Sequence, residues 1–190
     1  MNEIVCNSQV LEDYLRETYP QYSFISSTTK CLNKSSTEQE LTKNYKYVCL
    51  DYNLNKNKTF LEAMSVEEKE KTEFLINAIC PPGCPNRKHH YDLNGLEHIN
   101  FGKSYSVPFC EIRDNTISIA AEQSRNNISI QEIQQYYVPL GFFNFKIEGR
   151  TLPDMEVICN YAKFFIKPEH QLDFINSCYE SATLYQYPVF

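Results

Sequence analysis

Short apolar segments rich in β-branched and aromatic residues alternate along this chain with segments of helical spacing. The apolar segments predict strands at residues 3–8, 23–29, 47–53, 73–79 and 143–148, and a weaker one at 116–121. Strands that alternate with helices form βα units, and successive βα units build a parallel sheet. We therefore expect an α/β fold with a (β/α) barrel-type parallel sheet of five to six βα units.

The length of the chain limits how complete such a barrel can be. A β/α barrel usually needs about 250 residues and rarely fewer than about 200, whereas this chain has 190. No low-complexity tract or linker divides it, which favours a single domain over residues 1–190. We expect an incomplete barrel that is short of its first strands.

Helical spacing is present between most of the predicted strands. Residues 129–132 read Ser-Ile-Gln-Glu, the pattern of a capping box, and predict a helix to about residue 137. The other predicted helices cover residues 10–15, 37–44, 60–71, 151–165 and 168–179.

Residues 80–115 show no clear periodicity and predict a long cysteine-containing loop. Loops of that length in a compact domain are usually functional.

Charge and hydropathy exclude two classes of partner. The chain carries 18 Lys and Arg against 24 Asp and Glu, a net charge of −6, which argues against nucleic acid as a non-specific ligand. No stretch approaches the roughly 20 apolar residues of a membrane span, and the amino-terminal residues lack the pattern of a secretory signal. We expect no membrane association and a cytoplasmic location, where cysteines serve as thiols or metal ligands more often than in disulfides.

Polar residues gather where the predicted strands end. Ligands of parallel sheets and β/α barrels bind at the carboxyl ends of the strands. Asp51 and Asn53 end one strand and Asn77 ends the next, so all three are candidates for substrate binding. A polar layer with all its hydrogen bonds satisfied explains Asp51 and Asn53 equally well.

The chain has eight cysteines, and four of them fall in loops at the same predicted end of the sheet. Cys80 and Cys84 lie on a turn rich in proline and glycine, Cys31 follows a strand, and Cys110 closes the long loop. Four thiolates suit an iron–sulfur cluster or a structural zinc ion, and His89 or His90 is an alternative zinc ligand. Free thiols are the competing interpretation. The other four, which we expect to be buried, are Cys6, Cys49, Cys159 and Cys178.

A second candidate site lies on the last predicted strand. Asn144, Lys146 and Glu148 share one face of that strand, and Arg150 follows a glycine. Lys146 and Arg150 can hold an anionic group while Glu148 orients Lys146 or moves a proton. The structural alternative is an ion pair between Lys146 and Glu148 inside the barrel, with Arg150 bracing the loops.

These two stretches resemble the collagenase-like peptidase family of unassigned catalytic type, which includes proteins for hydroxylation of ubiquinone, tRNA and ribosomal RNA. The resemblance rests on Phe-Lys-Ile-Glu-Gly-Arg at 145–150, on its lead-in at 136–141, and on a strand ending in Asn-Ala-Ile-Cys at 77–80. It implies a β/α barrel and, in several members, a four-cysteine iron–sulfur cluster. By position the ligands are Cys80, Cys84 and Cys110, with Cys31 as the fourth.

We therefore expect an iron–sulfur barrel protein that acts in a hydroxylation or related redox reaction, with Lys146 and Glu148 as catalytic residues and Arg150 binding the substrate. A partner subunit or a second copy is expected to complete the barrel. One alternative is a peptidase acting on collagen-like or other peptides, although the chain has neither an H-E-x-x-H nor a G-x-S-x-G motif. The other is a non-catalytic partial barrel or structural zinc protein that binds a partner.

Overall fold

The computed structural model of the chain describes residues 2–78, 80, 82–105, 127–148 and 154–184. The chain divides into two compact units, Met1–Ile147 and Glu148–Phe190, which are considered separately below. A single domain over residues 1–190 stays a prediction.

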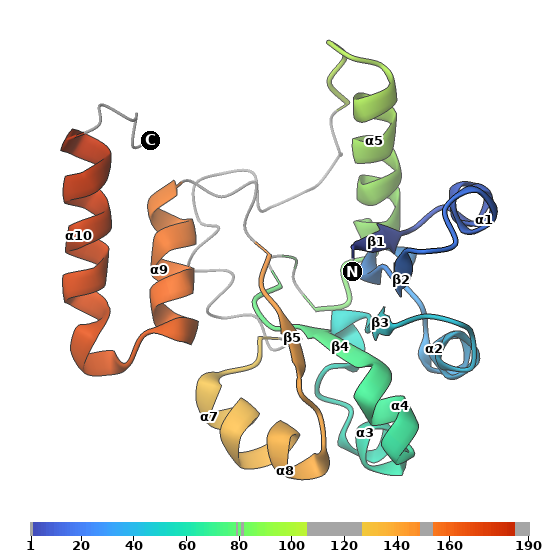
Figure 1. The fold of residues 1–190 in the computed structure, drawn as a ribbon, viewed down its shortest axis with the longest axis horizontal. Coiled ribbons are helices and arrows are strands. Elements are labelled where there is room, and N and C mark those ends of the chain that lie inside the picture. Colours follow the sequence, from blue (N-terminus) through green and yellow to red (C-terminus); the bar gives the residue numbers. More distant parts are fainter. Residues whose placement is uncertain (1, 79, 81, 106–126, 149–153, 185–190) are drawn as a thin grey trace. The chain divides into compact units, whose positions relative to one another are not determined.

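The amino-terminal unit is built on a parallel sheet of five strands, which confirms the predicted α/β class (Figure 1). Each strand pairs with the next one along the chain, so the order β1-β2-β3-β4-β5 never reverses. Strands wound into a β/α barrel share this sequential order, whereas doubly wound sheets reverse it at a switch point. The weaker strand predicted at 116–121 lies outside the described residues. The strands are β1 (Glu3–Cys6), β2 (Ser23–Ser26), β3 (Tyr47–Cys49), β4 (Thr72–Leu75) and β5 (Asn144–Lys146).

Helices occupy the connections between the first four strands, as predicted. Figure 1 shows them along one flank of the sheet. The helix predicted over 60–71 is two helices, because Ser65 begins a new one with a capping box. Its hydroxyl accepts the Glu68 N–H at 3.2 Å, and the Glu68 carboxylate accepts the Ser65 N–H at 2.8 Å. The helices are α1 (Gln9–Thr18), α2 (Lys34–Leu41), α3 (Lys58–Ala63) and α4 (Val66–Lys71).

The capping box predicted at Ser129 is confirmed. The Ser129 hydroxyl accepts the Glu132 N–H at 3.1 Å, and the Glu132 carboxylate accepts the Ser129 N–H at 2.8 Å. This cap begins α7 (Ile130–Glu132), which widens into one π-helical segment, η4 (Ile133–Tyr137), and ends in α8 (Val138–Leu140). Gly141, with φ of 97°, then turns the chain toward β5.

The prediction of a continuous loop over 80–115 is wrong in its central part. Residues Arg87–Ile99 form α5, a helix of 13 residues. The sequence does not predict this helix for two reasons. Gly95 interrupts the helical pattern, and most residues of the segment are polar, so no apolar face is evident. Residues 106–115 lie outside the described part of the chain.

The core on one face of the sheet is aromatic. Phe74 of β4 is fully buried, and its ring lies 5.0 Å from that of Tyr137, 5.1 Å from that of Phe142 and 5.9 Å from that of Phe145. The Tyr137 hydroxyl donates to the backbone carbonyl of Asn55 at 2.7 Å. This cluster holds α7, η4 and α8 against β4 and β5.

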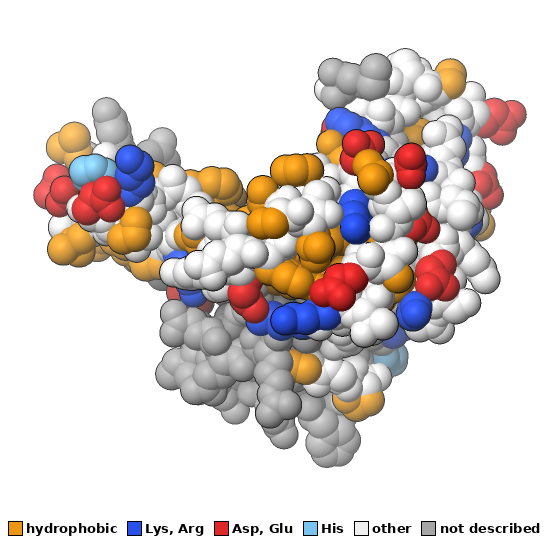
Figure 2. Space-filling view, turned by 90° about the horizontal axis from the view of Figure 1, so that it is seen from below, with side chains coloured by type: hydrophobic (Ala, Val, Ile, Leu, Met, Phe, Trp, Pro, Cys, Tyr) orange, Lys and Arg blue, Asp and Glu red, His pale blue; other side chains and the backbone are white. Residues whose placement is uncertain are grey.

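The amino-terminal edge of the sheet is uncovered among the described residues. β1 pairs with β2 on one side only, and Val5 of β1 is 48% exposed. Val10 and Tyr14 of the adjoining α1 are also exposed. Figure 2 shows another face of the molecule, on which apolar side chains gather between acidic and basic ones. Open parallel edges with apolar surface are typical contact sites for a further strand or subunit.

The carboxyl-terminal unit contains α9 (Asp154–Phe165), η5 (Pro168–His170) and α10 (Gln171–Leu184), which confirms the two predicted helices. The prediction of burial is wrong for one of its cysteines, because Cys159 is exposed, whereas Cys178 is half-buried. No helix in the described parts of either unit is both long enough and apolar enough to cross a membrane.

Candidate functional site at the carboxyl edge of the sheet

The centre of the candidate site is a buried ion pair between Asp51 and Arg87. β3 ends at Cys49, and Asp51 begins the short 3-10 helix η2 (Tyr52–Leu54), where its carboxylate accepts the Asn53 N–H at 2.9 Å. Both carboxylate oxygens of Asp51 also accept from the guanidinium of Arg87, the first residue of α5. The two residues are 6% and 4% exposed. Both carboxylate oxygens of Asp51 thus have partners within the protein. This favours the interpretation of Asp51 as part of a hydrogen-bonded polar layer over its interpretation as a substrate-binding residue.

Arg87 connects three segments that are distant in sequence. Its Nε donates to the sulfur of Cys31 at 3.3 Å, and its guanidinium lies 4.1 Å from the ring centroid of Tyr52. Cys31 follows β2 in the left-handed backbone conformation, with φ of 53°. Non-glycine residues rarely adopt that conformation, and where they do it commonly marks a constrained site. Arg87 therefore fastens the ends of β2 and β3 to the start of α5.

Cys80 and Cys84 lie near Tyr52, the ring that the Arg87 guanidinium contacts. Cys80 packs against the buried group formed by Cys49, Tyr52, Leu75 and Ala78. Burial raises the pKa of the Tyr52 hydroxyl, and the proximity of Cys80 and Cys84 raises it further. Both cysteines are half-buried. Both cysteines therefore lie near a residue that follows β3, and their predicted role as metal ligands stays a prediction.

Asn53 holds the cysteine-bearing turn in place. Its side-chain oxygen accepts the N–H of Gly83 at 2.9 Å, and Gly83 adopts a φ of 67° in the tight bend between the two cysteines. Asn77, which follows β4, is 4% exposed and lies in the protein interior. Both residues lie at the predicted end of the sheet, where the hydrogen bond between Asn53 and Gly83 connects two loops.

Thiolates are suitable donors for an iron–sulfur cluster or zinc, and three of the four predicted ligands are at the carboxyl edge. The fourth, Cys110, lies outside the described residues. Within the described part of the chain, no group of three or more His, Cys, Asp or Glu side chains is placed to hold a metal ion. Thiols are suitable donors for such a group, but Cys31, Cys80 and Cys84 are not placed together as a set that could hold a metal ion.

Lys146 of β5 lies beside a carboxylate that the sequence did not indicate. Its ammonium lies 3.7 Å from the carboxylate of Glu73 on the neighbouring strand β4, and it retains 37% exposure of its side chain. Glu148 follows β5 and is the first residue of the carboxyl-terminal unit, and Arg150 lies outside the described residues. Their predicted roles stay predictions.

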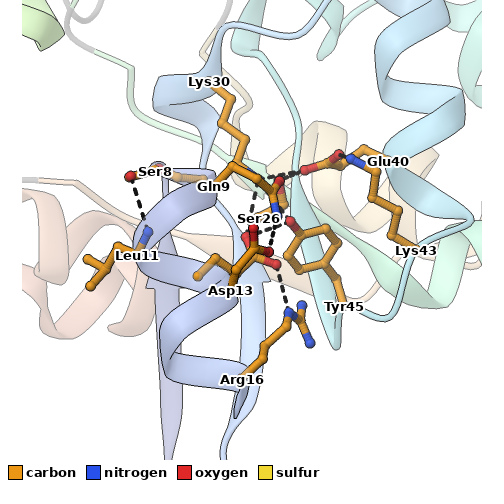
Figure 3. Close-up of polar contacts among 12 residues, drawn as sticks. Ser8, Gln9, Leu11, Asp13, Arg16, Ser26, Lys30, Glu40, Lys43 and Tyr45 are labelled. Atoms are coloured by element: carbon orange, nitrogen blue, oxygen red, sulfur yellow. Dashed lines mark hydrogen bonds and ion pairs between the residues drawn. The ribbon is translucent and has the colours of Figure 1, made fainter. Parts of the chain in front are cut away.

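A second polar cluster, which sequence analysis missed, surrounds Lys30 just after β2 (Figure 3). The Lys30 ammonium donates to Glu40 at 2.7 Å and to the Tyr45 hydroxyl at 2.9 Å. Glu40 also accepts from Ser26 at 2.6 Å and from Lys43 at 2.6 Å. Burial opposes ionisation of Glu40, but the hydrogen bonds from Lys30, Lys43 and Ser26 outweigh it and hold its pKa at about 2.

Glu12 of α1 is the other buried carboxylate of this cluster and is 2% exposed. It accepts from the Tyr45 hydroxyl at 2.7 Å and from Arg16 at 2.8 Å, and Lys30 lies 3.6 Å away. Burial and the hydrogen bond to Glu12 raise the pKa of Tyr45. In the sequence, only the spacing of Glu12 and Arg16 by four residues on one helix indicates this ion pair. The same spacing is equally typical of an exposed pair.

Comparison with known proteins identifies no relative. No family model matches the chain, and neither a curated protein sequence nor a solved structure matches it significantly.

Proposed function

We propose that this chain is an iron–sulfur protein with barrel-type winding that acts in a hydroxylation or related redox reaction. The observation that carries the proposal is that Cys31 contacts the buried Arg87, and that Cys80 and Cys84 lie near Tyr52, whose ring faces the same guanidinium. These cysteines follow β2 and β4, and Tyr52 follows β3, at the edge where parallel sheets bind ligands. The resemblance to the collagenase-like peptidase family supports the same assignment.

The proposed ligands of the cluster are Cys31, Cys80, Cys84 and Cys110. When bound, an iron–sulfur cluster supplies one-electron transfer. The chain's own contribution is positional: Asn53 fixes the turn that carries Cys80 and Cys84, and Arg87 fixes the loop that carries Cys31. The positive charge of Arg87 is balanced by the carboxylate of Asp51. Arg87 can therefore donate a hydrogen bond to the sulfur of Cys31 without being an uncompensated buried charge.

The last strand is the proposed position of the substrate-handling groups. Lys146 is partly exposed, and Glu73 holds its ammonium without burying it. A substrate anion can therefore reach Lys146 from solvent, and Arg150 is proposed to bind the same anion. Glu148 is proposed to move the proton, a role that carboxylates commonly have in general acid–base catalysis.

We also propose that another polypeptide extends the sheet into a more complete barrel. The sequential strand order is compatible with barrel winding, and the exposed β1 edge carries the apolar surface that an added strand or subunit would cover. A second copy of this chain or a separate subunit fits that description.

Cysteine variants purified without oxygen test the ligand assignment. Cys80→Ser, Cys84→Ser and Cys110→Ser are expected to abolish the visible absorption of the cluster, because each removes one thiolate ligand. The matched control is Cys159→Ser, since Cys159 is exposed on α9 and belongs to no proposed site. Equal absorption in all four variants would overturn the ligand assignment.

A further inference from the structure

The helical hairpin of the carboxyl-terminal unit buries very little of its apolar surface. Its two helices, α9 and α10, have 12 and 14 residues and lie side by side in contact with each other (Figure 1). Among residues 154–184, which the structure describes, Ala162 is the only one that is buried. Helices this short are marginally stable in water by themselves, and a pair of them is too small to enclose a core without further surface to pack against.

The first helix of this hairpin, α9, has apolar residues on two separate faces. Met155 and Ile158 share one face with the buried Ala162, because the three residues are spaced at positions i, i+3 and i+7. Four further apolar residues are centred about a third of the way around the helix axis from that face. We call them the second stripe: Val157, Tyr161, Phe164 and Phe165. A surface helix usually has one apolar face, and a helix that is apolar most of the way round is usually buried.

The second stripe is accessible to solvent in the hairpin. Phe165 is 69% exposed and Tyr161 is 46% exposed. Their rings stack with centroids 5.8 Å apart and so form a continuous aromatic surface. On α10, Leu172 and Tyr179 are also exposed, and their spacing of seven residues places them on one face of that helix. Exposed aromatic surface of this kind is typical of contact sites between proteins.

The charges of α9 favour a second copy of the same helix, in antiparallel orientation, as the partner of the second stripe. Asp154 and Glu156 lie in the first turn of α9, and Lys163 lies in its last turn. A two-fold axis across the helix places the acidic first turn of one copy beside the basic last turn of the other. A parallel arrangement would bring like charges together, which disfavours it. Glu156 and Lys163 lie on the polar face that borders the second stripe, at the rim of such a contact.

We propose that two copies of this chain associate through the second stripe of α9, so that their hairpins form an antiparallel four-helix bundle. Four helices enclose one apolar core, and bundles of this kind are built from hairpins with short connections such as the one through η5. The contact is self-complementary, because a two-fold axis pairs the same surface of both copies. It involves neither the proposed metal ligands nor the β1 edge, so it does not depend on the cluster or on extension of the sheet.

Sedimentation equilibrium of the full chain over a range of concentrations tests this association. Phe165→Glu is the informative variant, because it places a charge in the second stripe of each copy at a position where the folded monomer is exposed. Tyr161→Glu is a second variant of the same stripe. Leu184→Glu is the matched control: Leu184 is 77% exposed at the end of α10, on a different face of that helix from Leu172 and Tyr179.

The expected mass of the unmodified chain at high concentration is twice the 22.3 kDa of one copy. Phe165→Glu and Tyr161→Glu are each expected to raise the dissociation constant at least about tenfold, because a buried charge at the centre of the contact has no partner. Leu184→Glu is expected to change it less than about twofold. Circular dichroism is expected to show the same helix content in all four proteins, because the substituted side chains are exposed in one copy.

A chain that is monomeric at every concentration would overturn the proposal, and so would equal weakening by Phe165→Glu and Leu184→Glu, which would indicate non-specific apolar contact. A dimer that persists in Phe165→Glu would also overturn it. If that dimer were lost in Val10→Glu, at an exposed position of α1, the contact would belong to the β1 edge instead. Iron content, measured on the same samples, is expected to be the same in all variants, so failure of this contact and failure of the proposed cluster are distinguishable.

Discussion

Arg87 and Asp51 form a buried bidentate ion pair that joins the start of α5 to the segment after β3, although the two residues are 36 positions apart in sequence. The same arginine contacts the sulfur of Cys31 and the ring of Tyr52. One side chain thus orders the ends of two strands and the helix that follows the cysteine-bearing turn.

Removal of the Arg87 guanidinium is expected to be strongly destabilising. Arg87→Met leaves the Asp51 carboxylate buried without a counter-charge, which costs about 3–5 kcal/mol. Denaturation by urea gives the free energy of unfolding. Asp51→Asn in the Arg87→Met background should recover part of the loss, because it removes the orphaned charge. The neighbouring variant Lys88→Met is the control, since Lys88 is exposed; a similar loss in that variant would contradict the role assigned to the buried pair.

Stability is expected to fall in acid because of Glu40. Its folded-state pKa of about 2 is below its ordinary value of 4.5, so its contribution is complete above pH 4.5 and is lost as the pH falls toward 2. The corresponding free energy is of the order of 3 kcal/mol. Glu40→Gln should flatten the dependence of unfolding free energy on pH in this window. Glu38→Gln, at an exposed position on the same helix, should leave that dependence unchanged; an identical profile for Glu40→Gln and the parent chain would count against the prediction.

Two adjacent tyrosines allow the contribution of a buried hydrogen bond to be compared with that of an exposed one. Tyr137→Phe removes the hydroxyl that donates to the buried carbonyl of Asn55, and it is expected to lower the free energy of unfolding by about 1–3 kcal/mol. Tyr136→Phe removes an exposed hydrogen bond to Glu62 and should cost less than about 0.5 kcal/mol. Thermal or urea unfolding measures both changes. Equal costs would show that the buried hydrogen bond contributes no more than the exposed one.

The cysteines should differ sharply in reactivity in metal-free folded protein. Cys6 and Cys49 are 3% and 2% exposed, and burial raises the pKa of both thiols, so the nucleophilic thiolate is scarce and inaccessible. Cys159 is exposed and should be alkylated first. Mass spectrometry of peptides after brief treatment with iodoacetamide gives the order of modification. Early labelling of Cys49 in folded protein would contradict its position in the core.

Local sequence patterns were sufficient for the strands and most helices. The five predicted strands are present because each is a short run of β-branched or aromatic residues between polar segments, and the Ser129 box marks its helix start directly. The α5 helix was missed because its polar residues and Gly95 hide the helical period. The boundary at Ser65 was missed because the charged residues after it continue a helical pattern across the break.

The candidate site was predictable in its location but not in its contacts. Polar residues at strand ends predicted that Asp51, Cys80 and Cys84 would meet at one edge. Nothing local in the sequence identifies Arg87 as the partner of Asp51, because an arginine at a helix start is usually exposed. The Glu73 partner of Lys146 also required the register of β4 against β5, which pairs Leu75 with Lys146.

The central claim, a cysteine-ligated iron–sulfur cluster at the carboxyl edge of the sheet, is tested most directly by elemental analysis of the full chain purified without oxygen. The expected result is brown protein that contains iron and acid-labile sulfide in equal molar amounts. Colourless protein with stoichiometric zinc and no sulfide would contradict the claim and assign the cysteines to a structural zinc site.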